Sequence, residues 1–136
     1  MPPKYPSDIE TTIAGWPEAA KTCFHALRKV IFQTAASNSA VGTLEEVLKW
    51  GEPSFLTSQT RSGTTLRISW KPKTPDEIGV FVICRTDMLK QVRALYPEAF
   101  RYEGTRAAYL PLSHPIPEEA VAYLAMRAQT YHLETR

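Results

Sequence analysis

Cysteine and histidine are scarce in this chain, and their spacing excludes the common metal sites. The two cysteines, Cys23 and Cys84, lie far apart along the sequence. His25, His114 and His132 form none of the close pairs that zinc sites use. We therefore expect no bound metal, no cofactor and no disulfide framework. Reduced thiols of this kind are typical of a cytoplasmic protein.

Long apolar runs and a strong charge of one sign are also absent. Apolar runs such as residues 80–84 are far too short to span a bilayer. Residues 1–6 are rich in proline and are not followed by the apolar segment of a signal peptide. The net charge is only +2, and Lys and Arg form no continuous block or stripe. We therefore expect neither a membrane nor a nucleic acid as a partner.

The amino-acid composition is typical of one folded domain. Hydrophobic residues make up 43% of the 136 residues, and charged residues make up 22%. This balance supports a hydrophobic core and argues against disorder. We expect a single soluble domain spanning residues 1–136, in which residues 1–6 form a flexible arm.

Two helices are predicted before residue 37. Ser7 and Glu10 have the spacing of a capping box, so a short helix should begin there and end near Gly15. A longer amphipathic helix should follow from Pro17 to about residue 36, with an apolar stripe formed by Ala20, Phe24, Leu27 and Ile31. Phe32 falls on the polar side of that helix. We expect it to contact the N-terminal arm or a partner, and an exposed apolar patch around it would indicate a homodimer.

The segment 44–55 is interpreted as the junction between helices and sheet. Thr43 and Glu46 again have capping-box spacing, which predicts a short helix that ends at Gly51. Pro53 then directs the chain into a strand. Trp50 has two interpretations: a buried residue that fills the gap between helix and sheet, or the aromatic wall of a ligand pocket.

The rest of the chain alternates strands and helices. We expect strands over 55–60, 64–71 and 77–84 in an antiparallel meander, then a helix from Thr86 to Tyr96. The strand over 77–84 is apolar on both faces, which is typical of a central strand covered on both sides. A second hairpin over 100–103 and 106–112 precedes a last helix that begins at Pro117. The predicted fold is α+β, with about five antiparallel strands covered by the N- and C-terminal helices.

Several motifs resemble those of one family. Residues 47–55, Val-Leu-Lys-Trp-Gly-Glu-Pro-Ser-Phe, are similar to the W-G-x-P-x-[FY] signature of the DUF1801 (YdhG-like) family. Residues 81–86, 100–107 and 128–132 resemble one branch of it, although Thr105 stands where that branch has Asn. The resemblance covers roughly residues 16–133. It implies a compact α+β fold with an antiparallel sheet, and it implies no settled activity and no catalytic residues.

Some members of that family have been suggested as iron chaperones similar to frataxin, which makes iron handling one alternative for this chain. Iron prefers clustered carboxylates or histidines. Near the junction the only acidic cluster is Glu45, Glu46 and Glu52, and the main helix is basic. A second alternative is an uncharacterised enzyme that uses Cys84 or Glu52, since Cys84 precedes Arg85 and a helix start. The sequence favours a non-enzymatic role over both.

The candidate site is a basic strand face beside the junction. Arg67 and Lys71 alternate with apolar residues along one predicted strand, and Arg106 follows on the second hairpin. We expect these cations to form a floor for a carboxylate or phosphate group, close to three aromatic residues and one carboxylate: Trp50, Trp70, Tyr102 and Glu52. The sequence thus predicts that a small anionic ligand or a protein partner binds at Trp50–Pro53. The alternative is an ordinary solvent-facing side of the sheet.

Overall fold

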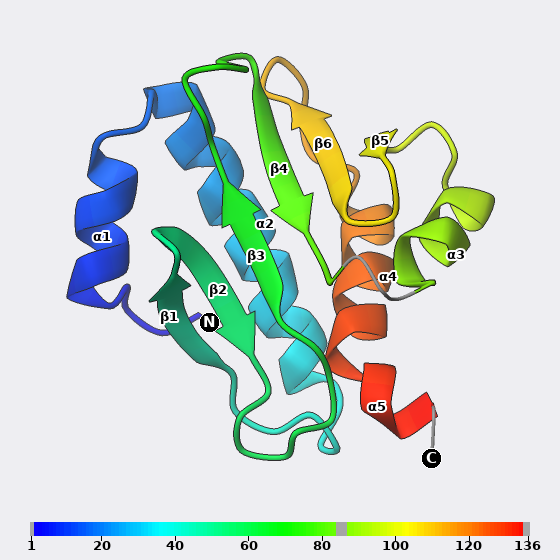
Figure 1. Ribbon diagram of the computed structural model, residues 1–136. Helices are drawn as coiled ribbons and strands as arrows, with labels where there is room; N and C mark the ends of the chain where they lie inside the picture. The colour runs from blue at the N-terminus through cyan, green and yellow to red at the C-terminus, as the bar shows by residue number, and fades with distance from the viewer. Residues whose placement is uncertain (1, 84–86, 135–136) are drawn as a thin grey trace.

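The computed structural model describes residues 2–83 and 87–134, which fold as one sheet backed by helices (Figure 1). The helices are α1 (Ser7–Ala14), α2 (Glu18–Ala36), α3 (Met88–Leu95), α4 (Glu118–Gln129) and α5 (Tyr131–Glu134). The strands are β1 (Glu45–Lys49), β2 (Glu52–Leu56), β3 (Leu66–Ser69), β4 (Glu77–Phe81), β5 (Arg101–Glu103) and β6 (Ala107–Pro111). None of the described helices combines the length and the apolarity that a bilayer crossing requires.

The sheet has the order β1-β2-β3-β4-β6-β5, and every neighbouring pair is antiparallel. The predicted α+β class, the meander and the second hairpin are therefore confirmed. The sheet has six strands rather than about five, because the segment predicted as a helix at the junction is strand β1. It pairs with β2 along its whole length, from Glu45 opposite Leu56 to Lys49 opposite Glu52.

The prediction of a helix at the junction is wrong for a specific reason. Trp50 and Gly51 both have positive φ angles, 53° and 75°, as type I′ hairpin turns require. Gly51 thus closes a hairpin rather than a helix. The Thr43 and Glu46 capping pair does not form either: the Thr43 amide donates to Gln59 Oε1, and Glu46 turns toward helix α2.

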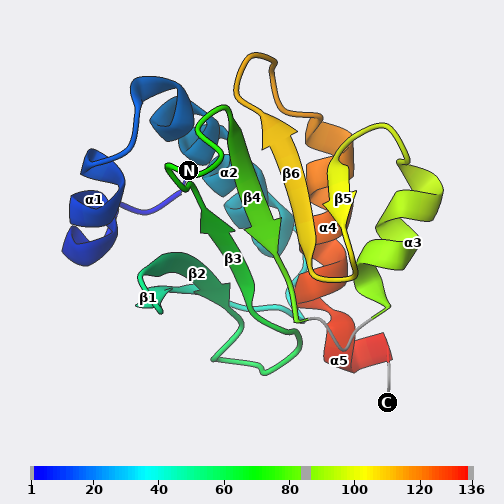
Figure 2. The same ribbon diagram turned by 45° about the horizontal axis from the view of Figure 1, so that its top comes forward.

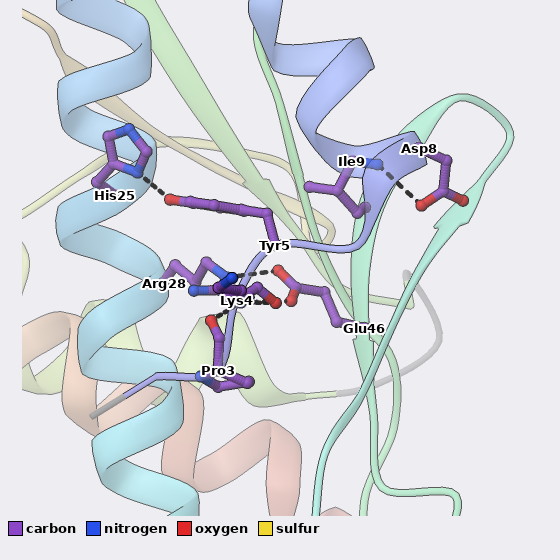
Figure 3. Close-up of polar contacts among 8 residues, drawn as sticks. All are labelled: Pro3, Lys4, Tyr5, Asp8, Ile9, His25, Arg28 and Glu46. Carbon is purple, nitrogen blue, oxygen red and sulfur yellow. Dashed lines mark hydrogen bonds and ion pairs between the residues drawn. The ribbon is translucent and has the colours of Figure 1, made fainter.

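Glu46 forms a buried ion pair with Arg28, and this pair joins β1 to α2. Arg28 Nε and Nη2 donate to the two carboxylate oxygens of Glu46 over 2.6 and 2.7 Å (Figure 3). Nη2 also donates to the carbonyl of Pro3 at 2.7 Å, which ties the N-terminal segment to the same guanidinium. The Tyr5 ring lies 4.1 Å from the guanidinium carbon and stacks near Phe24. Residues 3–5 therefore lie against α2, while the predicted flexibility of the arm stays a prediction.

The core lies between the sheet and the pair α2 and α4, which pack on each other behind the strands. The predicted stripe of α2 is confirmed, because Ala20, Phe24, Leu27 and Ile31 are all buried. Phe32 packs at its edge against Phe55 and lines a cleft with Pro2 and Pro3. The helical spacing of Met88, Leu89, Val92 and Leu95 predicts a buried face for α3, and Leu95 departs from it because it is 60% exposed. The predicted cap Thr86 lies outside the described residues.

The other face of the sheet carries no described helix, and both views show its middle strands uncovered (Figure 2). Strand β4 is central, as predicted, but helices cover it on one face only. On the open face the ring of Phe81 lies over Gly79: a Cβ on that glycine would be 2.7 Å from the ring. The chain therefore covers this face with its own aromatic and arginine side chains.

Candidate functional site

Trp50 stands at the tip of the β1–β2 hairpin and is 89% exposed. The prediction that it is a buried plug is therefore wrong, because the chain turns back at Trp50 instead of burying it between helix and sheet. Its φ of 53° is rare for a bulky residue, and such backbone costs about 1–3 kcal/mol. Neither burial nor backbone preference explains a tryptophan at this position.

Arg67 connects the hairpin tip to the open face of the sheet. Its guanidinium carbon lies 5.5 Å from the centre of the Trp50 ring system and 5.9 Å from that of Phe81. Nη1 donates to Glu52 Oε1 over 3.1 Å, and Lys71 Nζ lies 3.2 Å from the other carboxylate oxygen. Glu52, Arg67 and Lys71 therefore lie together near the hairpin tip, and their predicted role in binding stays a prediction. One carboxylate, that of Glu52, holds both cations.

The row of rings and cations continues across the sheet. Phe81 meets Tyr109 edge to face, with ring centres 5.9 Å apart, and Arg101 lies 4.3 Å above the Tyr109 ring. Arg101 donates to both carboxylate oxygens of Glu77, over 2.8 and 2.7 Å. These hydrogen bonds lower the pKa of the Glu77 carboxyl, while partial burial acts in the other direction. Burial raises the pKa of Tyr109. At this end of the row, the positive charge of Arg101 is therefore balanced by the carboxylate of Glu77.

Three other predicted site residues lie elsewhere. Trp70 follows β3 with its side chain half-buried against the core, and its indole N–H donates to the Pro75 carbonyl over 3.0 Å. Tyr102 pairs in register with the buried Ala108, so it faces the helices, and its hydroxyl donates to the Tyr96 carbonyl. Arg106 is exposed in the turn between β5 and β6. The proximity of Trp70 and Tyr102 to the basic floor is therefore not observed.

A polar cleft at the opposite end of β2 and β3 was missed by the sequence reasoning. Seven described residues line it, Leu56, Thr57, Ser58, Arg61, Gly63, Thr65 and His132, around a volume of about 340 Å³. From the sequence, residues 61–63 (Arg-Ser-Gly) are predicted only as the turn between the strands expected over 55–60 and 64–71. The available signal was an arginine at the start of that turn, but its proximity to His132 depends on the packing of the C-terminal helices.

The metal and thiol hypotheses gain little from the described residues. In the ranges 2–83 and 87–134, no three His, Cys, Asp or Glu side chains are placed to hold a metal ion. The enzyme hypothesis on Cys84 lies outside the described residues. The thiol of Cys23 is buried. Burial raises its pKa to about 11, so the thiol stays protonated and unreactive at neutral pH. Glu52 is occupied by Arg67 and Lys71.

No protein-family model, curated protein or solved structure matches this chain. The resemblance to the DUF1801 family therefore stays a prediction.

Proposed function

We propose that this protein is a non-enzymatic binding module, and that the hairpin tip at Trp50–Pro53 binds an acidic segment of a protein partner. The observation that carries the proposal is Trp50 itself, which is almost fully exposed and held in unfavourable backbone geometry. Strained backbone persists where function requires it. Exposed tryptophans beside arginines are frequent anchors of protein interfaces.

The charge around Trp50 indicates the chemistry of the partner. The register places Lys49 opposite Glu52, on the face that also carries Arg67. Arg67 and Lys71 both pair with the carboxylate of Glu52, so two cations share one negative charge, and Lys49 adds a third cation to the same face. A partner segment with Asp or Glu next to an apolar residue would complement this surface. The Trp50 ring would take the apolar residue, and Lys49 and Lys71 would steer the acidic ones.

The experiment is a selection of random peptides displayed on phage against the wild-type protein. We expect the enriched peptides to be acidic and to lose binding to Trp50→Asn and Arg67→Gln. Lys29→Gln removes one exposed cation from α2, behind the sheet, and should leave binding unchanged. Enrichment of basic or neutral peptides would contradict the proposal, as would peptides that bind Trp50→Asn as well as the wild type.

A small anionic ligand is the second candidate, because Arg67 and Lys71 already converge on one carboxylate within 3.2 Å. A ligand carboxylate would have to displace that of Glu52. Glu52→Gln should therefore strengthen the binding of a dicarboxylate such as glutarate, as measured by calorimetry. If the wild type and Glu52→Gln both fail to bind glutarate, this second candidate is wrong and the peptide proposal is unaffected.

A further inference from the structure

The polar cleft beside Arg61 lies at the end of the sheet away from Trp50, and its floor is held rigidly. The Arg61 amide donates to the Thr57 carbonyl over 2.6 Å, and the Gly63 amide donates to Thr57 Oγ1 over 2.9 Å. The Thr64 amide donates to the carbonyl of Ala128 at the end of α4. Gly63 fits only because it lacks a side chain, since a Cβ would lie 2.1 Å from that carbonyl oxygen. The loop is thereby fixed against α4.

The same docking brings α5 to the cleft. The His132 amide donates to the Ser62 carbonyl over 2.8 Å, and Ser62 Oγ donates to the Gln129 carbonyl over 2.7 Å. His132 and Arg61, which are far apart in the sequence, therefore line one cavity. The site is built by tertiary packing and not by one flexible loop, so its geometry exists before any ligand arrives.

The chemistry of the lining is suited to an anion. Arg61 supplies a guanidinium with several N–H donors, and His132 supplies an imidazole. Thr57 accepts the Gly63 amide, which leaves its own hydroxyl proton to donate to another acceptor. None of the seven described lining residues is acidic. A carboxylate does lie beyond the rim, where Ser58 donates to Glu45, and it would oppose an anion bound on that side.

The backbone of Arg61 gives a second, independent observation. Its φ is 56°, in the left-handed region that Asn and Gly adopt readily and that residues with long side chains adopt uncommonly. An arginine that persists at such a position indicates that its guanidinium is needed there. The exposed side chain lies at the cleft, where its planar fork can form two hydrogen bonds to one tetrahedral anion.

We propose that this cleft binds the phosphate group of a small phosphorylated metabolite. Its volume of about 340 Å³ is at the lower end of the range for small-molecule sites, so there is room for more than the phosphate alone. The half-buried Leu56 would contact the organic part. This site is separate from the hairpin tip, so either assignment can fail without the other.

The test is a titration of the ¹⁵N-labelled full chain with inorganic phosphate and with phenyl phosphate, in chloride at constant ionic strength. We expect saturable amide shifts over residues 57–65 and at His132, with phenyl phosphate binding more tightly. Arg61→Asn should weaken binding by about tenfold or more, because charge-assisted hydrogen bonds are lost while the left-handed backbone is accommodated. The affinity of Arg61→Lys should lie between those of the wild type and Arg61→Asn. The affinity of Arg93→Gln, a substitution on α3, should match that of the wild type.

Several outcomes would overturn the proposal. Shifts that do not saturate, or that are unchanged in Arg61→Asn, would show that Arg61 builds no phosphate site. Shifts confined to Arg67 and Lys71 would assign the anion to the hairpin tip instead. Equal affinity for phosphate and phenyl phosphate would refute the organic part of the assignment. Thermal unfolding of Arg61→Asn guards against misfolding, and we expect its melting temperature to equal or exceed that of the wild type.

Discussion

Arg28 and Glu46 form a bidentate ion pair in which the two side chains are only 5% and 4% exposed. The pair joins the central helix α2 to the edge strand β1, and the same guanidinium holds the carbonyl of Pro3. A buried pair of this kind contributes little when both members are replaced by apolar residues of similar size, but losing one member leaves an uncompensated charge. It therefore fixes where β1 and the N-terminal segment dock.

Glu46→Ala should lower the free energy of unfolding by about 3–5 kcal/mol, because Arg28 would be left buried without its counter-ion. Urea unfolding measures this. Glu18→Ala is the matched control, since Glu18 pairs with Lys21 on the surface and its loss should cost less than about 1 kcal/mol. The double variant Arg28→Met/Glu46→Leu should recover most of the loss. Equal effects of Glu46→Ala and Glu18→Ala would contradict the assigned role.

Trp50→Asn should leave stability unchanged or raise it by up to about 1 kcal/mol, because Asn-Gly is the preferred sequence of a type I′ turn. The substitution removes the cation–π contact with Arg67. Because this contact is exposed, it contributes only about 0.5–1 kcal/mol to stability. Thermal and urea unfolding give the comparison. A loss above about 1 kcal/mol would mean that Trp50 stabilises the fold, which would contradict the proposal that it is kept for binding.

The error at residues 44–49 shows where sequence reasoning on this chain ends. The capping-box spacing of Thr43 and Glu46 is a local signal, whereas the fate of Glu46 is decided by Arg28, eighteen residues earlier. The alternation of Arg67 and Lys71 with apolar residues, by contrast, correctly identified strand β3 and its buried face of Leu66 and Ile68, although Ser69 on the opposite face is buried as well. Tyr102 could not be assigned to a face, because this depends on the register that the turn of the second hairpin sets.

Gly63→Ala should destabilise the fold by about 3 kcal/mol, since the new Cβ would collide with the backbone carbonyl of Ala128 and separate the β2–β3 loop from α4. Gly15→Ala is the control: its Cβ would lie 3.8 Å from the nearest atom and its φ is −82°, so stability should change little. Urea midpoints decide between the two. If Gly63→Ala is as stable as Gly15→Ala, the loop is not docked as described.

Cys23 should resist alkylation until strongly alkaline pH. Burial raises the pKa of its thiol from its ordinary value of 9.0 to about 11, so the folded state favours the protonated form. The resulting contribution to stability is fully present below pH 9 and is lost as the pH rises toward 11. Iodoacetamide labelling of the Cys84→Ser variant measures the one remaining thiol. Labelling of the folded protein that rises near pH 9, as it should in urea, would contradict this account.

The most direct measurement of the central claim uses the three tryptophan indole N–H signals of the ¹⁵N-labelled protein. Trp16 packs against Phe24, Trp70 is bonded to Pro75, and Trp50 is 89% exposed beside Arg67 at the hairpin tip, so the signals report on three separate places. On titration with an acidic peptide enriched in the phage selection, we predict that the Trp50 signal shifts and saturates while the other two stay in place. A peptide that binds and shifts Trp16 or Trp70 without moving Trp50 would contradict the account.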